Sequence, residues 1–149
     1  EGRFPLILTE RKEHLAILEE MLSSHIENLG VLYGGIGIKE RRKIFDKLNS
    51  SGDAPKALLA TGAYIGEGFD DPRLDTLFIA MPIAFKGKVI QYAGRLHRKH
   101  HTKTDIRIYD YVDEKVSVAV AMYKKRLKAY KTMGYEIKED SSLAVDALI

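Results

Sequence analysis

Short apolar runs alternate with helical patterns along this chain. Five apolar runs bounded by turn residues predict buried strands, at residues 5–8, 30–33, 57–60, 76–81 and 106–111. Apolar residues at helical spacing predict the intervening helices, at residues 10–22, 39–48, 89–97 and about 114–130. This alternation is typical of a mainly parallel sheet covered by crossover helices, so the sequence predicts an α/β fold.

The pattern also predicts where the elements begin and what they bury. Thr9 is expected to be the N-cap of the first helix, and Gly134 is expected to stop the last one. The predicted buried stripe of the first helix consists of Leu15, Leu18, Met21 and Leu22. The predicted apolar side of the last helix consists of Val116, Val120, Tyr123, Leu127 and Tyr130. Ligands of such a sheet bind beyond the carboxyl ends of its strands, where we expect Thr9, Gly34, Thr61 and the segment after Pro82.

Length and composition narrow the class of protein. The 149 residues suit one domain with a sizeable core, and no run approaches the roughly 20 apolar residues of a membrane-spanning helix. The net charge of +3 is compatible with nucleic acid but does not require it. The absence of cysteine excludes disulfides, thiolate chemistry and the usual zinc sites, and it fits a reducing cytoplasmic location. The start at Glu1, without Met or a signal peptide, suggests a fragment of a longer protein.

The sharpest chemical signal is the sequence Gln-x-x-Gly-Arg-x-x-Arg at residues 91–98. On a helix Arg95 and Arg98 leave the same side, which Gln91 shares, and Gly94 would let another surface approach closely. Two planar, permanently charged guanidinium groups suit a polyphosphate whose negative charge shifts during phosphoryl transfer. A lone Arg-x-x-Arg is usually a solvated face, but average residue usage predicts the full pattern at roughly one start position in 10⁵.

A second signal lies about 30 residues upstream, in Ala-Thr-Gly-Ala-Tyr-Ile-Gly-Glu-Gly-Phe-Asp-Asp-Pro at residues 60–72. Thr61 and Gly62 offer a hydroxyl and backbone N–H groups to a phosphate oxygen. Gly66 and Gly68 would let the turn take positive φ, and Asp70 could accept a hydrogen bond from a sugar hydroxyl. Taken alone, the segment reads equally well as a glycine-rich strand-to-helix turn.

Together, in this order, the two segments resemble motifs V and VI of superfamily 2 helicases. Leu-Ile-Leu-Thr at residues 6–9 resembles motif IV, and Leu-Tyr-Gly-Gly at 32–35 followed by Glu-Arg-Arg at 40–42 resembles motif IVa with its helix. The resemblance covers roughly residues 5–113. With Gln91 leading and His97 between the arginines, motif VI is closer to DNA-directed members related to type III restriction and excision-repair helicases than to DEAD-box RNA helicases.

This resemblance implies a RecA-like three-layer α/β/α sandwich at residues 1–137, the second motor domain of a helicase or translocase, with residues 138–149 as a tail or the start of a further segment. It implies that Arg98 is the arginine finger on the γ-phosphate and that Arg95 contacts the same phosphate or organises the interdomain cleft. Gln91, Gly68 and Asp70 would serve the nucleotide, with Asp70 accepting from the ribose. The implied contacts to a nucleic-acid strand, with DNA favoured, are Thr61, Gly62, Gly34, Gly35 and Thr9.

The missing motifs are equally informative. The sequence contains no G-x-x-x-x-G-K-[S/T] loop and no DEAD-type carboxylate motif for magnesium. By the resemblance, ATP with Mg²⁺ would be held mainly by an N-terminal RecA-like domain of the same protein, and the arginines would complete its site like fingers acting in trans. We therefore expect no ATP hydrolysis by this chain alone.

Other polar groups carry less information. His97, His100 and His101 lack the cysteine or spaced carboxylate of a metal site, so no metal site is predicted. The basic run of the last helix reads first as a solvated face, with strand contact as the alternative for Lys124, Lys128 and Lys131. The run consists of Lys124, Lys125, Arg126, Lys128 and Lys131.

Two other functions remain open at this point. One is a RecA-like module that binds nucleic acid or a protein without ATP coupling, against which the two motif VI arginines count. The other is a self-sufficient mononucleotide-binding α/β domain, against which the lack of a G-x-G-x-x-G turn counts.

Overall fold

The computed structural model describes residues 2–66, 69–81 and 86–138 and contains one five-stranded sheet. All of its strand pairs are parallel, in the order β2-β3-β1-β4-β5. The strands are β1 (Pro5–Thr9), β2 (Asn28–Leu32), β3 (Lys56–Thr61), β4 (Thr76–Ile79) and β5 (Arg107–Asp110). The predicted parallel sheet is therefore confirmed, with strand ends within about two residues of the apolar runs.

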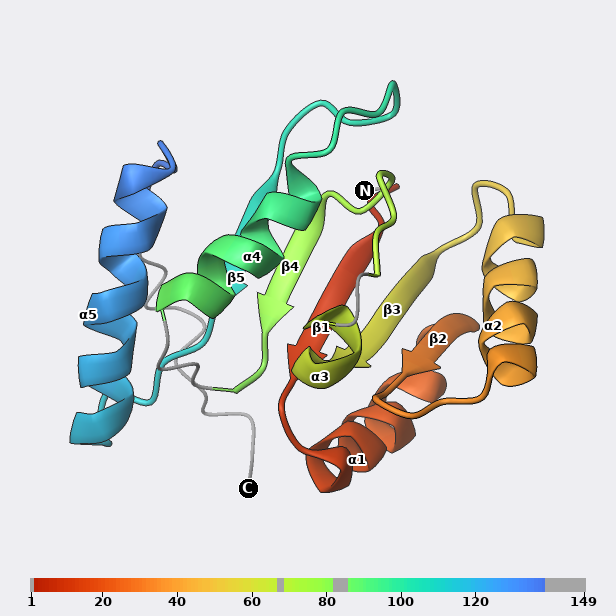
Figure 1. The fold of residues 1–149 in the computed structure, drawn as a ribbon, viewed down its shortest axis with the longest axis horizontal. Helices are drawn as coiled ribbons and strands as arrows, with labels where there is room; N and C mark the ends of the chain where they lie inside the picture. The colour runs from red at the N-terminus through yellow and green to blue at the C-terminus, as the bar shows by residue number, and fades with distance from the viewer. Residues whose placement is uncertain (1, 67–68, 82–85, 139–149) are drawn as a thin grey trace.

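Helices follow each strand along the chain. They are α1 (Lys12–Ser23), α2 (Ile38–Ser50), α3 (Gly62–Gly66), α4 (Lys86–Leu96) and α5 (Ser117–Thr132). The connection from β1 to β2 runs one way across the sheet and the next three run the other way, so right-handed crossovers place α1 on one face and α2, α3 and α4 on the opposite face. Figure 1 shows α3 and α4 in front of the strands and α5 at the β5 edge. This is the predicted three-layer α/β/α arrangement.

The core lies between the sheet and these helices. Because both faces are covered, the strands are apolar almost throughout, and Leu6, Leu58 and Leu77 are completely buried. A Cβ atom at Gly30 would lie 2.8 Å from the Cγ2 atom of Ile44 and 2.9 Å from Cδ1 of Leu48. Glycine at this position therefore lets α2 pack closely against β2.

Local details differ from the prediction where side chains find partners that sequence spacing does not reveal. Thr9 is not a helix N-cap: it is the last, buried residue of β1, and its hydroxyl lies 2.8 Å from Nδ1 of His14. Met21 and Val116 were expected in buried stripes but are about half exposed, because α1 buries mainly Leu15 and α5 begins only at Ser117. Gly66 closes the short helix α3 without a positive φ.

The prediction for Gly134 is confirmed. It follows the C-cap of α5 with a φ of 84°, the left-handed conformation that ends many helices. Earlier in the same helix, the prediction for Arg126 is wrong. Arg126 is fully buried, not part of a solvated face, because its guanidinium donates two 2.7 Å hydrogen bonds to the carboxylate of Asp110 at the end of β5.

Candidate functional site

Three of the residues predicted to bind a nucleic-acid strand lie at the carboxyl ends of β1, β2 and β3. They are Thr9, Gly34 and Thr61. Thr9 and Thr61 are buried and lie side by side in the parallel register. The backbone N–H of Gly34, just beyond β2, donates to the hydroxyl of Thr61 over 3.3 Å. Gly35 next to it is exposed and has a φ of 84°, which glycine adopts without strain. The result is a compact edge in which two buried hydroxyls lie beneath the exposed backbone of Gly35.

Positive charge flanks this edge. The ammonium of Lys12, at the first turn of α1, lies 5.0 Å from the ring centroid of Tyr33, the residue before Gly34. Such an arrangement holds a cation beside an aromatic surface. The edge therefore combines groups that contact a phosphate backbone without reading bases.

Gly62 follows Thr61 and begins α3. A Cβ atom here would lie 2.5 Å from both Oε1 of Glu10 and the hydroxyl oxygen of Tyr92, so no larger residue fits without movement. The requirement for glycine at this position comes from packing inside the domain, and its proposed phosphate contact is a separate property.

The two motif VI arginines approach the segment that joins α3 to β4. The Nε atom of Arg98, just after α4, lies 3.2 Å from Oδ2 of Asp70. An Nη2 atom of Arg95 lies 3.5 Å from the backbone oxygen of Ile65 in α3. The predicted shared side assumed one helix, but α4 ends at Leu96, so Arg98 lies beyond it. The side chain of Arg98 remains 60% exposed.

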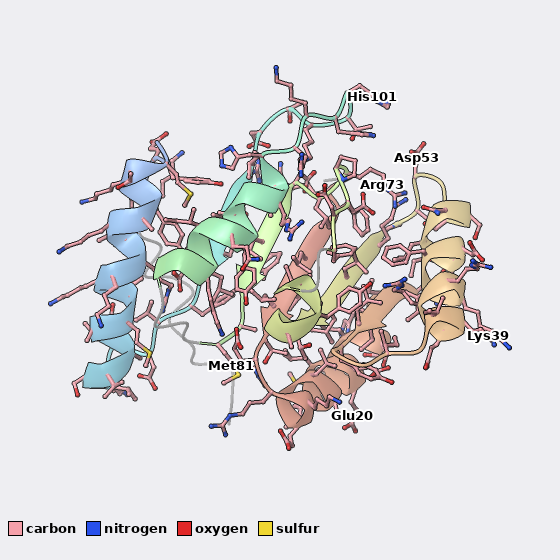
Figure 2. The ribbon with its side chains drawn as sticks, viewed as in Figure 1. Glu20, Lys39, Asp53, Arg73, Met81 and His101 are labelled. Atoms are coloured by element: carbon pink, nitrogen blue, oxygen red, sulfur yellow. The ribbon has the colours of Figure 1, made fainter. Side chains whose placement is uncertain are left out.

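These arginines lie toward the opposite end of the sheet from the threonines. Helix α4 runs back along the strands, so its end returns to the edge where Asp75 donates its N–H to the backbone oxygen of Phe4 before β1. Figure 2 shows Arg73 and His101 at this end and Met81, after β4, at the other. The expected location at carboxyl strand ends is therefore correct for Thr61 and its neighbours but not for the arginines.

Lys103 fixes the backbone that carries Arg98. Its ammonium donates 2.7 Å hydrogen bonds to the backbone oxygens of Leu96 and Arg98, where α4 ends. Burial lowers the pKa of Lys103, while the carboxylates of Asp75, Asp71 and Asp70 act in the opposite direction. A cation that binds the last carbonyls of a helix stabilises that end.

A hollow of about 500 Å³ lies beside Asp70. Its walls include Phe45 and Phe69, whose rings stack with centroids 5.8 Å apart. On the same wall Arg73 donates two hydrogen bonds to Asp71. Burial alone would raise the pKa of Asp71, but these bonds and the backbone N–H of Arg73 hold that pKa below its usual value. The wall is therefore anchored by a charged pair.

Glu10 joins the chain just after β1 to α4. The hydroxyl of Tyr92 in α4 donates to Oε1 of Glu10 over 3.4 Å, and the ammonium of Lys88 lies 3.4 Å from Oε2. Burial and the charge of Glu10 raise the pKa of Tyr92 to about 12, so the phenol keeps its proton and remains a donor. The chain just after β1 is thus bonded to α4, which carries Arg95 and ends two residues before Arg98.

The remaining predicted residues have simpler surroundings. Gln91 is exposed on α4, and Gly68 lies outside the described residues. The rings of His100 and His101 lie with centroids 4.3 Å apart on an exposed loop. Within residues 2–66, 69–81 and 86–138, no three His, Asp or Glu side chains are grouped as metal ligands would be.

Sequence reasoning missed Glu10 and Lys103. The partners of Glu10 lie 78 and 82 residues further along the chain, so no local pattern indicates them. Lys103 could have been found, because a lysine shortly after a predicted helix commonly binds its last carbonyls.

Comparisons with known proteins agree with the resemblance. Residues 1–100 match the family model described as "Helicase conserved C-terminal domain". "Putative helicase 161L" of Invertebrate iridescent virus 6 is 39% identical over 83 residues, which cover 56% of this chain and 18% of that protein. "Uncharacterized protein 108L" of Invertebrate iridescent virus 3 is 35% identical over 82 residues, covering 55% of this chain and 74% of that protein. The chain thus matches less than a fifth of the length of the first relative.

Solved structures share the fold. The C-terminal part of the Fun30 ATPase domain superposes with a TM-score of 0.69 over 83% of this chain and 39% of that one, at 18% identity. The C-terminal domain of the DEAD-box protein Dbp5 gives 0.64 over 89% of this chain and 71% of that one, also at 18% identity. The predicted RecA-like fold is confirmed.

Among the helices described here, none has the length and apolar character needed to cross a membrane.

Proposed function

The chain belongs to the helicase conserved C-terminal domain family, and we propose that it supplies the arginine finger and the strand grip of an ATP-dependent helicase or translocase. The observation that carries this proposal is the separation of two surfaces on one domain. One is the edge of the sheet beside Thr9, Thr61 and Gly34, and the other holds Arg95 and Arg98 with Asp70. A motor needs both, because binding and release of the nucleic-acid strand must alternate with ATP binding and hydrolysis.

The second surface offers hydrogen-bond donors to phosphate and an acceptor to a ribose hydroxyl. Arg98 and Arg95 would hold a phosphate, Asp70 would accept from a ribose hydroxyl, and Gln91 and Gly68 would help to position the nucleotide. ATP with Mg²⁺, held mainly by an N-terminal RecA-like domain, supplies the phosphoryl group and its charge neutralisation. The exposed guanidinium of Arg98 and carboxylate of Asp70 fit this use, because surface charges can exchange partners at little cost.

The pair between Arg98 and Asp70 gives this domain an open state. While Asp70 holds Arg98, neither group is available to a nucleotide. Closure of the two motor domains would exchange this pair for contacts to phosphate and ribose, and reopening would restore it. The movement is of the hinge type. The hydrogen bond that Tyr92 of α4 donates to Glu10 links the helix that carries Arg95 to the carboxyl end of β1.

A finer assignment belongs to the same proposal. We place the domain at residues 1–137, with residues 138–149 as a tail or the start of another segment. DNA is favoured over RNA because Gln91 leads motif VI, and Thr61, Gly62, Gly34, Gly35 and Thr9 are the proposed strand contacts. A cytoplasmic location stays a prediction from the cysteine-free composition.

Strand binding is tested with Thr61→Val, which keeps the shape and removes the hydroxyl. We expect the wild-type chain to bind unrelated single-stranded oligonucleotides with similar affinity, and the affinity to fall steeply with salt. The variant should bind about 10- to 150-fold more weakly, since one hydrogen bond to a charged group is worth roughly 1.5–3 kcal/mol. Fluorescence anisotropy across a salt series measures both effects.

Ser50→Ala is the matched control, because its hydroxyl is exposed at the end of α2, away from this edge. Strong sequence selectivity, or an affinity that ignores salt, would favour the second candidate: a RecA-like module that binds nucleic acid or protein without ATP coupling. The presence of both motif VI arginines, with Arg98 exposed and Arg95 half-buried, favours the motor.

A further inference from the structure

Helix α5 presents a face of lysines that the proposed function does not use. Lys124, Lys125, Lys128 and Lys131 are exposed, and the sequence of α5 contains no Asp or Glu. Within the described part of the chain, none of these four ammonium groups lies within ion-pair distance of a carboxylate. Nitrogen-tipped side chains leave α5 on the side away from the sheet (Figure 2). Among the described residues, the face is thus positive and without a neutralising carboxylate.

The buried side of α5 fixes the direction of this face. Arg126 donates two 2.7 Å hydrogen bonds to Asp110, and the hydroxyl of Tyr130 donates a third of the same length. Successive residues of an α-helix turn by about 100°, so Lys124, Lys128 and Lys131 lie within roughly 40° of the direction opposite Arg126. Rotation of α5 would break a buried ion pair, so the three lysines are held outward.

The spacing of these lysines suits a row of phosphates. Lys124 and Lys131 are separated by about 10.5 Å along the helix axis, which corresponds to roughly three phosphates of one strand. Like charges at i and i+4, as at Lys124 and Lys128, are slightly destabilising unless an anion lies between them. The chemistry of the face is therefore that of a polyanion site.

The position of α5 separates this face from the strand edge. Thr61 and Gly34 lie at the ends of strands in the β2-β3-β1 half of the sheet, whereas α5 stands at the β5 edge (Figure 1). Ala119, Ala129 and Tyr130 of α5 are buried against the domain, and of the large apolar side chains of this helix Val118 is exposed, which is too small an apolar surface for insertion into lipid. A membrane is therefore a poor partner, and a second stretch of nucleic-acid backbone is a good one.

We propose that the face formed by Lys124, Lys128 and Lys131 binds the phosphate backbone of a nucleic-acid segment other than the one gripped at Thr61. This inference rests on the proposed nucleic-acid function and adds a second contact surface to it. The contact is electrostatic and reads no sequence, because lysine presents a mobile point charge and α5 offers no fork-shaped donor outward.

The test is a triple variant of the 149-residue chain, Lys124→Gln with Lys128→Gln and Lys131→Gln. The probes are a labelled single-stranded DNA and the duplex of the same length. Removal of three phosphate contacts should reduce the slope of log K against log salt by about 2 for the single strand and about 2.7 for the duplex. The thermal midpoint should not fall, because the three side chains are exposed and repel one another.

The control variant removes three exposed lysines that are scattered over the domain: Lys43→Gln, Lys99→Gln and Lys138→Gln. It has the same net charge, so an equal change of slope in both variants would overturn the inference. Tighter binding of polyglutamate than of DNA to the wild-type chain would also overturn it and would assign the face to an acidic protein.

Thr61→Val, measured in parallel, separates the two proposals. Weakening by Thr61→Val with an unchanged α5 variant contradicts only the inference about α5. Weakening by the α5 variant with an unchanged Thr61→Val contradicts only the grip assigned to the strand edge. If the wild-type chain binds neither probe, the inference is overturned, and ATPase measurements then decide on the motor.

Discussion

Replacing Arg98 by alanine in the full-length protein should lower kcat by about 10³ to 10⁵, the range known for arginine fingers that act in trans. A finger stabilises charge that develops in the transition state, so the affinity for ATP should change far less than kcat. Arg98→Lys should not restore the rate, because a point charge cannot reproduce the planar fork. Steady-state ATPase rates and nucleotide Kd values, measured on the same preparations, test this expectation.

The structure also predicts that Arg98 contributes little to folding. Its side chain is 60% exposed, and a surface ion pair like that with Asp70 contributes about 0–1 kcal/mol. Lys99→Ala, which removes the neighbouring exposed charge, is the matched control and should keep kcat close to wild type. A near-wild-type kcat for both Arg98 variants contradicts the finger, and a collapse of the melting temperature would make Arg98 structural.

The second large effect is on stability, at Arg126. Arg126→Met should destabilise the domain by about 3–5 kcal/mol, because it leaves the buried carboxylate of Asp110 without its cation. This is a large share of the roughly 5–15 kcal/mol that holds a typical domain folded. Denaturation by urea, followed by circular dichroism, gives the free energy of unfolding.

Two further variants make this result specific. Arg126→Met combined with Asp110→Leu removes both charges and should recover most of the loss, although the hydroxyl of Tyr130 then lacks its acceptor. Lys125→Met changes the exposed neighbour and should stay within about 0.5 kcal/mol of wild type. Equal stability of Arg126→Met and Lys125→Met would show that the buried pair does not stabilise α5.

The fold could be predicted because its signals are local. Strands buried on both faces are short apolar runs, such as that containing Leu58, and a glycine such as Gly134 ends a helix through its own φ. Side-chain contacts to residues far away in the sequence could not be predicted. Thr9 lies within hydrogen-bond distance of His14 and does not cap a helix. Arg126 is buried because it donates to the carboxylate of Asp110 at the end of β5.

The same distinction applies to the site. Thr61 meets Thr9 because parallel strands end together, which the pattern of strands predicts. Helical spacing does not fix the direction of Arg98 relative to Arg95, because α4 ends at Leu96. The pair of Arg98 with Asp70 depends on where α4 returns along the sheet, which no spacing within either motif specifies. The role of Glu10 depends on contacts about 80 residues apart and is visible only in the folded chain.

The central claim is that this domain is half of a nucleic-acid-dependent ATPase, and steady-state ATP hydrolysis tests it most directly. The 149-residue chain and the full-length protein are compared at equal concentration, each with and without single-stranded DNA. We expect no turnover above the blank for the chain alone, because its sequence lacks a phosphate loop and a magnesium carboxylate motif. The full-length protein should hydrolyse ATP faster when single-stranded DNA is present. Clear hydrolysis by rigorously pure chain, or a full-length protein whose rate ignores the strand, would contradict it.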